Sequence, residues 1–434
     1  MSQEVARSLE PSTQFWCFEV LRGNCFWAWQ NFRWNRKSHE PLDGDLKPMR
    51  WAIVADDLTG AADSAVAFAD QGIATAVWLC EPKEFPDGTC CSVDADARWR
   101  NEKSAAIAVS EFVRKLRTAD WIMLKIDSTL RGFVGAMVKA AWQSSGRKWA
   151  LIAPAVPKQG RKVVNGKLFV HGRPVTEIDL AKEQPAPVTT PSVMERVRNT
   201  GLDKFPLEHL GLEVTKRHNL LTQAIERAAM NGVGLICDAE TDRDLTSIVR
   251  VAIKASTKPL FVGASGLARA LAKVTGGNFV KRKLTFQTKP NRVLVIVGSQ
   301  QTLAREQLEF LAAKGIPVIK MSGETLPDLP EARISAISLN PDRLLNFVAR
   351  SRAPNANFLT RFDALVIVGG LTARAIFDVL GVKRWDLLGS LLSGMPFGVV
   401  QSRNKTLLVA TKAGGFGTKQ TLWRAVVRLE KMAL

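Results

Sequence analysis

Short apolar segments alternate with helix-like stretches along most of the chain, and this alternation constrains the fold more than any other feature. Segments 51–55, 121–125 and 293–297 have the length of strands, and each is followed by a polar or glycine-containing loop. Strands that alternate with helices form parallel sheets covered by helices, because a parallel connection needs a long crossover. The sequence therefore predicts an α/β fold.

Two such series are present, separated by the basic, polar stretch 281–291, which includes Pro290. At 434 residues the chain is long enough for more than one core. We predict a first domain over 49–280, a linker over 281–291 and a second domain over 292–434. Each domain is expected to be a largely parallel sheet flanked by helices, with a cleft between the two domains.

The expected elements follow from the apolar periodicity and the turn signals. Asn165-Gly166 lies between two short apolar runs and predicts a hairpin over 163–175. The other expected strands are 51–55, 73–79, 121–125, 149–153, 293–297, 318–321, 365–368 and 407–410, and the expected helices are a stretch ending near 72, 303–314 and 373–380.

Residues 1–48 differ from the rest of the chain. They hold four of the twelve tryptophans without a period of 2 or 3.6, and they contain no continuous apolar core of a secretion signal. Because Met49 stands just before the first strand, one hypothesis is that translation starts there and that 1–48 is an atypical extension. The intact mass of the native protein tests this.

Composition excludes several classes of protein. No apolar stretch approaches the ~20 residues of a membrane-spanning helix, and the six cysteines lack the paired spacing of a zinc site. We therefore expect a soluble, cytoplasmic protein with no membrane partner. The formal charge of +19 favours anionic partners. Its scattered distribution favours a small anion and a nucleotide over nucleic acid.

Polar clusters follow three strands of the first series, where the carboxyl ends of parallel strands bind ligands. They are 56–60 with Asp63 one turn later, 125–132, and 154–161. Carboxylates suit a hydroxyl nucleophile, and basic groups suit an acid substrate. The alternative is that Asp57 and Asp127 cap the helices that follow. The segment 94–98 adds further charges, and His171 is expected to be a turn residue.

Glycine loops follow three strands of the second series, at 298–299, 369–373 and 412–417. Glycine lets the backbone approach a phosphate, and a helix N-terminus offers free N–H donors. None of the three is a Walker A loop or a dinucleotide-binding fingerprint. Each alone could be an ordinary turn, but together they indicate a nucleotide site.

From residue 51 to the C-terminus the chain resembles the four-carbon acid sugar kinase family, which includes threonate, erythronate and 3-oxo-tetronate kinases. The resemblance is carried by 55–63, 125–132 and 412–417. It implies phosphate transfer from ATP, with Mg²⁺, to a hydroxyl of the sugar acid, O4 being the expected position. The sugar acid would bind to the first domain and ATP to the second.

The resemblance also assigns individual residues. Asp57 and Asp127 are the candidates for the carboxylate nearest the accepting hydroxyl, and Arg131 is expected to hold the substrate carboxylate. The other residues on the acid-sugar side are Asp56, Arg98, Lys125 and Ser128. Those on the nucleotide side are Ser299, Gly369, Gly370, Leu371, Thr372, Gly414 and Gly415. No metal ligand is assigned.

Three positions depart from the family pattern. Leu371 stands where an acidic residue is usual, Ser390 stands where Glu is usual, and Gln301 replaces a serine. The first two motivate an alternative function, a sugar-acid-binding regulatory protein of the same fold with weakened catalysis. A nucleic-acid-binding protein is a third reading that rests on charge alone. The sequence leaves open a homo-oligomer.

Overall fold

The computed structural model describes residues 49–182, 185–198, 206–276, 290–321, 330–339, 358–402 and 405–431. Contacts group Pro48–Leu434 into one compact unit. The extension expected over 1–48 and most of the linker expected over 281–291 lie outside the described residues. The predicted division into domains therefore stays a prediction, and we refer to 49–276 as the front half and to 290–431 as the back half.

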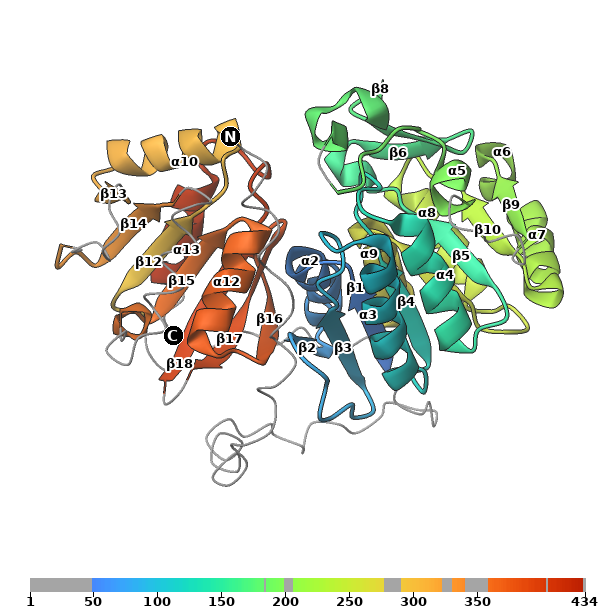
Figure 1. Cartoon of the computed structure of the whole chain (residues 1–434), viewed down its shortest axis with the longest axis horizontal. Coiled ribbons are helices and arrows are strands. Elements are labelled where there is room, and N and C mark those ends of the chain that lie inside the picture. The colour runs from blue at the N-terminus through green and yellow to red at the C-terminus, as the bar shows by residue number, and fades with distance from the viewer. Residues whose placement is uncertain are drawn as a thin grey trace, which may run out of the picture. The chain divides into compact units, whose positions relative to one another are not determined.

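The front half alternates strands and helices (Figure 1). Its strands are β1 (Trp51–Ala55), β2 (Ala74–Trp78), β3 (Thr89–Asp94), β4 (Trp121–Lys125), β5 (Ala150–Ala153), β6 (Arg161–Val164), β7 (Lys167–Val170), β8 (Arg173–Pro174), β9 (Leu207–Leu210), β10 (Gly234–Cys237) and β11 (Leu260–Gly263). Its helices are α2 (Leu58–Ala69), α3 (Glu102–Lys115), α4 (Val134–Ser145), α5 (Val193–Arg198), α6 (Leu212–Thr215), α7 (His218–Asn231), α8 (Asp242–Ala252) and α9 (Ser265–Thr275), with short 3-10 turns at Pro157–Gln159, Val175–Glu177 and Asp179–Lys182.

The back half continues with strands β12 (Val293–Val297), β13 (Val318–Lys320), β14 (Ile334–Ser338), β15 (Ala364–Val368), β16 (Arg384–Leu392), β17 (Met395–Ser402) and β18 (Lys405–Lys412). Its helices are α10 (Thr302–Ala313), α12 (Gly370–Leu380) and α13 (Thr421–Lys431), with a 3-10 turn at Leu359–Arg361. The strands and helices predicted from periodicity occur here within a few residues of their expected ends.

The front sheet has the order β2-β3-β1-β4-β11-β5-β10-β9, and all its pairings are parallel. The chain leaves β1 toward β2 on one side and leaves β4 toward β5 on the other. In open α/β sheets, ligands bind where neighbouring strands send their connections in opposite directions. The loops after β1 and β4 meet that description.

The back sheet contains a second switch point of the same kind. Its parallel part has the order β13-β14-β12-β15-β18. The chain leaves β12 toward β13 on one side and leaves β15 toward β16 on the other. The glycine loops at 298–299 and 369–370 follow these two strands, so the topology places them side by side.

Helices cover both faces of the back sheet, and the side chains of β12 show why its sequence is apolar throughout. Val293, Val295 and Val297 belong to a core shared with α10 and α13. Leu294 and Ile296 point to the other face and join the core that contains residues of α12. A strand buried on both faces loses the alternation of polar and apolar residues, which is what the sequence shows.

Hydrogen bonds join the two halves into one fifteen-stranded sheet among the described residues. The antiparallel strands β17 and β16 continue the back sheet from β18, and β16 pairs antiparallel with β2 through Arg384–Trp78 and Leu387–Thr75. The predicted α/β class with mostly parallel strands is confirmed. This edge-to-edge connection had no counterpart in the sequence analysis.

The hairpin expected at Asn165-Gly166 is present. Strands β6 and β7 pair antiparallel, and both turn residues have positive φ, 50° for Asn165 and 69° for Gly166. Two positive φ values are those of a two-residue turn that matches the twist of its strands. His171 lies in the next turn at φ 49° and is exposed, as predicted.

No helix among the described residues is long and apolar enough to cross a membrane.

Candidate active site

Asp57 has two structural roles after β1. It is the N-cap of α2, where its Oδ1 accepts a hydrogen bond from Gly60 N at 2.7 Å. It also accepts two hydrogen bonds from Arg98, from Nη1 at 2.7 Å and from Nη2 at 2.8 Å. Its side chain keeps 17% of its exposure. The capping alternative is thus correct for Asp57, but it does not account for the pairing with Arg98.

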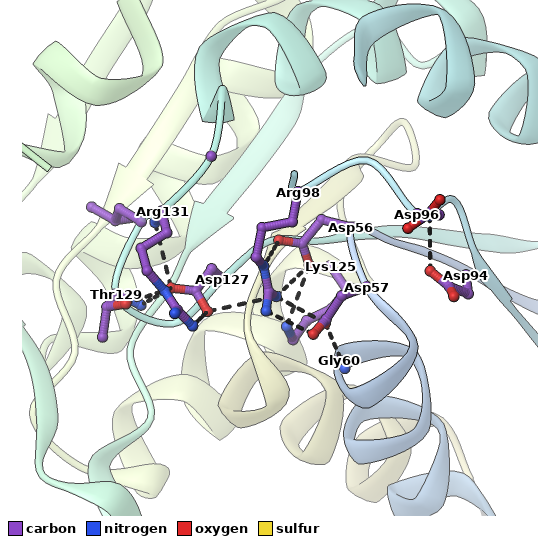
Figure 2. Close-up of polar contacts among 12 residues, drawn as sticks. Asp56, Asp57, Gly60, Asp94, Asp96, Arg98, Lys125, Asp127, Thr129 and Arg131 are labelled. Carbon is purple, nitrogen blue, oxygen red and sulfur yellow. Dashed lines mark hydrogen bonds and ion pairs between the residues drawn. The ribbon is translucent and has the colours of Figure 1, made fainter. Parts of the chain in front are cut away.

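Arg98 is a buried centre of charge at the end of the segment that follows β3 (Figure 2). Besides its two bonds to Asp57, it donates to both oxygens of Asp56, from Nε at 2.8 Å and Nη2 at 2.9 Å. Its Nη2 also lies 3.5 Å from Asp127 Oδ1. One guanidinium therefore connects the loops that follow β1, β3 and β4.

Asp127 is held by the loop that follows β4. Arg131 donates to it in a bidentate manner, with Nε 2.9 Å from Oδ2 and Nη2 2.9 Å from Oδ1. The backbone N–H and the hydroxyl of Thr129 also donate to Oδ2. Helix α4 begins only at Val134, so Asp127 is a loop residue and not a helix cap.

The surroundings shift the pKa values of Asp56 and Asp127 in opposite directions. Burial would raise the pKa of Asp127, but the charges of Arg131 and Arg98 hold that pKa well below its usual range. Burial raises the pKa of Asp56 despite the opposing charges of Arg98 and Lys125. Burial also acts to lower the pKa of Arg98, yet its carboxylate partners outweigh this and raise that pKa well above its ordinary value. Asp127 is therefore a firmly ionised, poor proton acceptor.

Lys125 extends the cluster from the last residue of β4. Its Nζ lies 3.9 Å from Asp56 Oδ1 and would lie 2.7 Å from a Cβ placed on Gly60. A side chain at Gly60 would therefore displace the amine from the first turn of α2. Ser128 is partly exposed between Asp127 and Thr129.

The three glycine loops of the back half pack against one another. A Cβ on Gly414 would overlap the hydroxyl of Ser299, and a Cβ on Gly415 would overlap the side-chain oxygen of Gln301. A Cβ on Gly369, which has φ 112°, would lie 3.6 Å from Ser299 N. The loops after β12, β15 and β18 thus form one surface, as the switch-point topology requires.

Two helices begin at this surface without a side-chain cap. In the described part of the chain, α10 with N-cap Gln301 and α12 with N-cap Gly369 receive no capping hydrogen bond from a side chain. Their first backbone N–H groups remain available, and the helix dipoles favour negative charge there. Leu371, in the first turn of α12, is 61% exposed.

Lys412 organises the third glycine loop from inside. Its Nζ donates to three backbone carbonyls, those of Ala413 at 2.8 Å, Gly414 at 3.1 Å and Phe416 at 2.8 Å. Burial lowers the pKa of this amine to about 8. Since the carbonyls point toward the lysine, the amine fixes the path of the loop.

The two sets of loops meet at Gly370. A Cβ on that residue would lie 2.6 Å from Thr59 Oγ1 and 3.5 Å from Asp57 Oδ2. Nearby, Arg374 of α12 donates from Nη1 to Asp94 Oδ2 at 2.8 Å. The carboxylate cluster of the front half therefore lies beside the glycine loop that starts α12.

The departure from the family pattern at Ser390 has a structural explanation. Ser390 bonds through its N–H and hydroxyl to Asp70, at 2.8 and 2.7 Å. Asp70 is the C-cap of α2, about 20 Å along that helix from Asp57 by helical rise. Ser390 thus has a role in joining β16 to α2.

Sequence reasoning missed four residues that the structure places around these loops. Asp94 and Lys412 lay in segments that were recognised, but nothing in the sequence marked them individually. Arg196 of α5 donates to the carbonyls of Leu130 and Gly132, both at 2.8 Å, and so holds the residues that flank Arg131. Arg161 belongs to the cluster 154–161. Pairing across distant segments could not be inferred from spacing.

No group of three or more His, Cys, Asp and Glu side chains is arranged to hold a metal ion within the described ranges. Fold and site together define an α/β protein that presents a cluster of carboxylates and cations next to loops suited to bind phosphate. Comparison with known proteins shows which family of this class the chain belongs to.

A family model described as a sugar-binding N-terminal domain matches residues 51–271, and one described as a nucleotide-binding C-terminal domain matches 346–422. The chain belongs to the four-carbon acid sugar kinase family, which confirms the resemblance. Curated relatives include a D-threonate kinase of Salmonella typhimurium, 28% identical over 88% of this chain and 99% of the relative. A 3-oxo-tetronate kinase of Brucella melitensis is 23% identical over 87% of this chain and 95% of the relative.

Two crystal structures share the fold at 18% identity. A protein of Haemophilus influenzae superposes with a TM-score of 0.66, covering 87% of this chain and 99% of that protein. A protein of Salmonella typhimurium superposes with a TM-score of 0.68, covering 86% and 98%. The similarity supports the architecture described above.

Proposed function

We propose that this chain is an ATP-dependent kinase that phosphorylates a hydroxyl, O4 in our proposal, of a four-carbon sugar acid such as threonate, erythronate or 3-oxo-tetronate. The names of the curated relatives, D-threonate, 3-oxo-tetronate and D-erythronate kinase, support this substrate class. The observation that carries the proposal is the proximity of Asp57 and Thr59 to Gly370, because it brings the acidic loop to the loop suited for phosphate.

Asp57 is the better of the two candidates for the carboxylate that accepts the hydroxyl proton. Asp127 is surrounded by donors, and its pKa is held well below the usual range. Asp57 retains more exposure than Asp127, 17% against 8%, and it lies beside Gly370. A general base must reach the proton that it abstracts. In this proposal Asp56, Arg98 and Lys125 orient Asp57, and Asp127 fixes the loop of Ser128 and Arg131.

The back half suits a nucleotide. The uncapped helix starts at Gln301 and Gly369 offer backbone N–H groups, and the glycines leave space that a Cβ would fill. In our proposal Ser299, Gly369, Gly370, Leu371, Thr372, Gly414 and Gly415 surround the phosphates. Mg²⁺ often binds through one or two carboxylates together with phosphates and waters, so in this proposal the phosphates of ATP supply part of its coordination. Bound Mg²⁺ would neutralise phosphate charge.

The transfer needs little covalent chemistry from the protein. The substrate hydroxyl oxygen forms a bond to the γ-phosphorus as the bond between that phosphorus and the bridging oxygen breaks, and ADP leaves with the electron pair. The hydroxyl proton passes to Asp57. Backbone N–H donors at the helix starts stabilise the charge on the transferring phosphoryl oxygens.

The alternative of a regulatory protein with weakened catalysis is not favoured, because the full-length curated relatives carry the names of kinases. The contact of Ser390 with Asp70 gives that substitution a structural role and removes part of the motivation. Leu371 remains a difference that activity measurements can address.

We also propose a cytoplasmic location, with which the free thiols of Cys90, Cys91 and Cys237 are compatible.

A coupled assay of ADP release across threonates, erythronates and 3-oxo-tetronates tests the function. Asp57→Asn is the informative variant, because Asn is also a good N-cap and should leave α2 intact. We expect kcat to fall roughly 10²- to 10⁴-fold with the loss of the base, while Asp96→Asn, an exposed neighbour of the cluster, keeps full activity. Absence of ADP release with every acid, or full activity of Asp57→Asn, would contradict the proposal.

A further inference from the structure

The cations that line the front-half site are almost all committed to carboxylates. Arg98 binds Asp56 and Asp57, Lys125 lies near Asp56, and Arg131 binds Asp127. Three carboxylates therefore face three cations. A sugar acid adds a fourth carboxylate, and burying an anion without a cationic partner is unfavourable. The site needs one further positive charge for its substrate.

Arg161 supplies a positive charge of the required kind. It is the first residue of β6, directly after the loop that follows β5, and β5 lies in the same parallel sheet as β1 and β4. Its backbone is fixed by hydrogen bonds in both directions with Val156. Its side chain is partly buried, and its Nη1 donates to Gln159 Oε1.

The hydrogen-bonding capacity of Arg161 is only partly used. Its buried Nε has no hydrogen-bond partner, and among the described residues no carboxylate lies within ion-pair distance of its guanidinium. Arg196 differs in that its Nη2 donates to the carbonyls of Leu130 and Gly132, although its Nε is also buried without a partner. A buried donor left unpaired is unfavourable, and an incoming anion would satisfy it.

Arg161 is electrically coupled to the site. Burial lowers the pKa of Arg161. Among the neighbouring charges, Asp127 raises this pKa, Arg131 lowers it and Asp63 raises it. The topology agrees, because β5, β11 and β4 are parallel neighbours and the loop after β5 leaves the same edge of the sheet as the loop 127–131 after β4. The guanidinium is thus near the acid-sugar site without being neutralised by it.

We propose that Arg161 binds the carboxylate of the sugar acid, in place of Arg131, and so selects an acid over a neutral polyol. The guanidinium would donate from Nε and a terminal nitrogen to the two carboxylate oxygens, the bidentate geometry that arginine favours. Arg131 remains the partner of Asp127. This inference rests on the proposed function, because it assigns one substrate group within that reaction.

The test compares Arg161→Met with the wild type on two substrates, the preferred tetronate and the tetritol that carries CH₂OH in place of its carboxylate. For the acid we expect KM to rise roughly 10- to 100-fold, the effect of one charge-assisted interaction, with kcat nearly unchanged. For the tetritol, kcat/KM should stay at the wild-type value. Arg161→Lys should show an intermediate KM, because it keeps the charge but not the fork.

Lys158→Met is the matched control, since Lys158 lies in the same segment but is exposed and pairs with Asp242; its KM should not change. Calorimetry with the acid alone should show the same loss of affinity in Arg161→Met without any phosphate transfer. An unchanged KM for the acid, or equal losses for acid and tetritol, overturns the inference. If wild type releases no ADP with any acid, the proposed function fails, whereas calorimetry still judges the role of Arg161 in binding.

Discussion

Asp94 provides a pH-dependent test of the electrostatics at the contact between β3 and α12. Its carboxyl is buried, accepts a hydrogen bond from Asp96 N at 2.8 Å and pairs with Arg374. Burial raises its pKa from 3.8 to about 7, although Arg374 opposes the shift. The perturbation that tests this is Asp94→Asn, which keeps the shape and removes the titration.

The magnitude follows from the shift in pKa. One pKa unit corresponds to about 1.4 kcal/mol, so ionising Asp94 in the folded state costs up to about 4 kcal/mol relative to the unfolded chain. Because the folded-state pKa lies above the unfolded one, the stabilisation by the protonated form is complete below pH 3.8 and is lost as the pH rises through about 7. About 3 kcal/mol of this change falls between about pH 5 and about pH 8.5, and relaxation around the charge reduces it to roughly 1–3 kcal/mol.

Urea unfolding followed by tryptophan fluorescence at those two pH values measures the effect. The quantity compared is the free energy of unfolding of Asp94→Asn minus that of wild type. We expect this difference to be larger by roughly 1–3 kcal/mol at the higher pH than at the lower. Asp96→Asn is the control, since Asp96 is exposed and Asn tolerates its φ of 49°. The same stability difference at both pH values, or a larger loss at high pH, would refute the reasoning.

Three further predictions concern the loops. Lys412→Met leaves three carbonyls without their donor and should raise KM for MgATP roughly tenfold with little effect on KM for the acid. Arg196→Met releases the carbonyls that flank Arg131. It should raise KM for the acid with little effect on KM for MgATP. Steady-state kinetics with each substrate varied in turn would decide, and equal effects on both substrates would contradict separate roles. Leu371→Asp should tighten MgATP binding about two- to threefold, because a carboxylate in the first turn of α12 favours the helix and offers an oxygen to Mg²⁺; calorimetry measures this, and weaker binding would contradict it.

The fold was predictable wherever the chain carries its own local signal. The apolar runs at β1, β4, β12 and β15 identified the strands around both switch points, because strands covered on both faces must be apolar throughout. The pairing of β16 with β2 could not be predicted. It depends on contacts between residues about 310 positions apart, such as Leu387 and Thr75, and no local pattern encodes such a partner.

The candidate site shows the same division. Asp56, Asp57, Lys125 and Asp127 stand at strand ends, so their proximity followed from the topology of a parallel sheet. Which cation each carboxylate binds, and which donors stay unpaired, could not be predicted. The pairing of Arg131 with Asp127 and the unused donor of Arg161 depend on side-chain directions that only the folded chain defines.

The enclosure of Lys412 has a consequence for the chemical durability of the loop. An amine whose pKa is about 8 has a larger neutral fraction near pH 7 than an ordinary surface lysine, and neutral amines react readily with acylating metabolites. Here the residue is only 1% exposed and its amine is surrounded by three peptide oxygens. Electrophiles in solution are therefore kept from the nitrogen that donates to the three carbonyls of this loop.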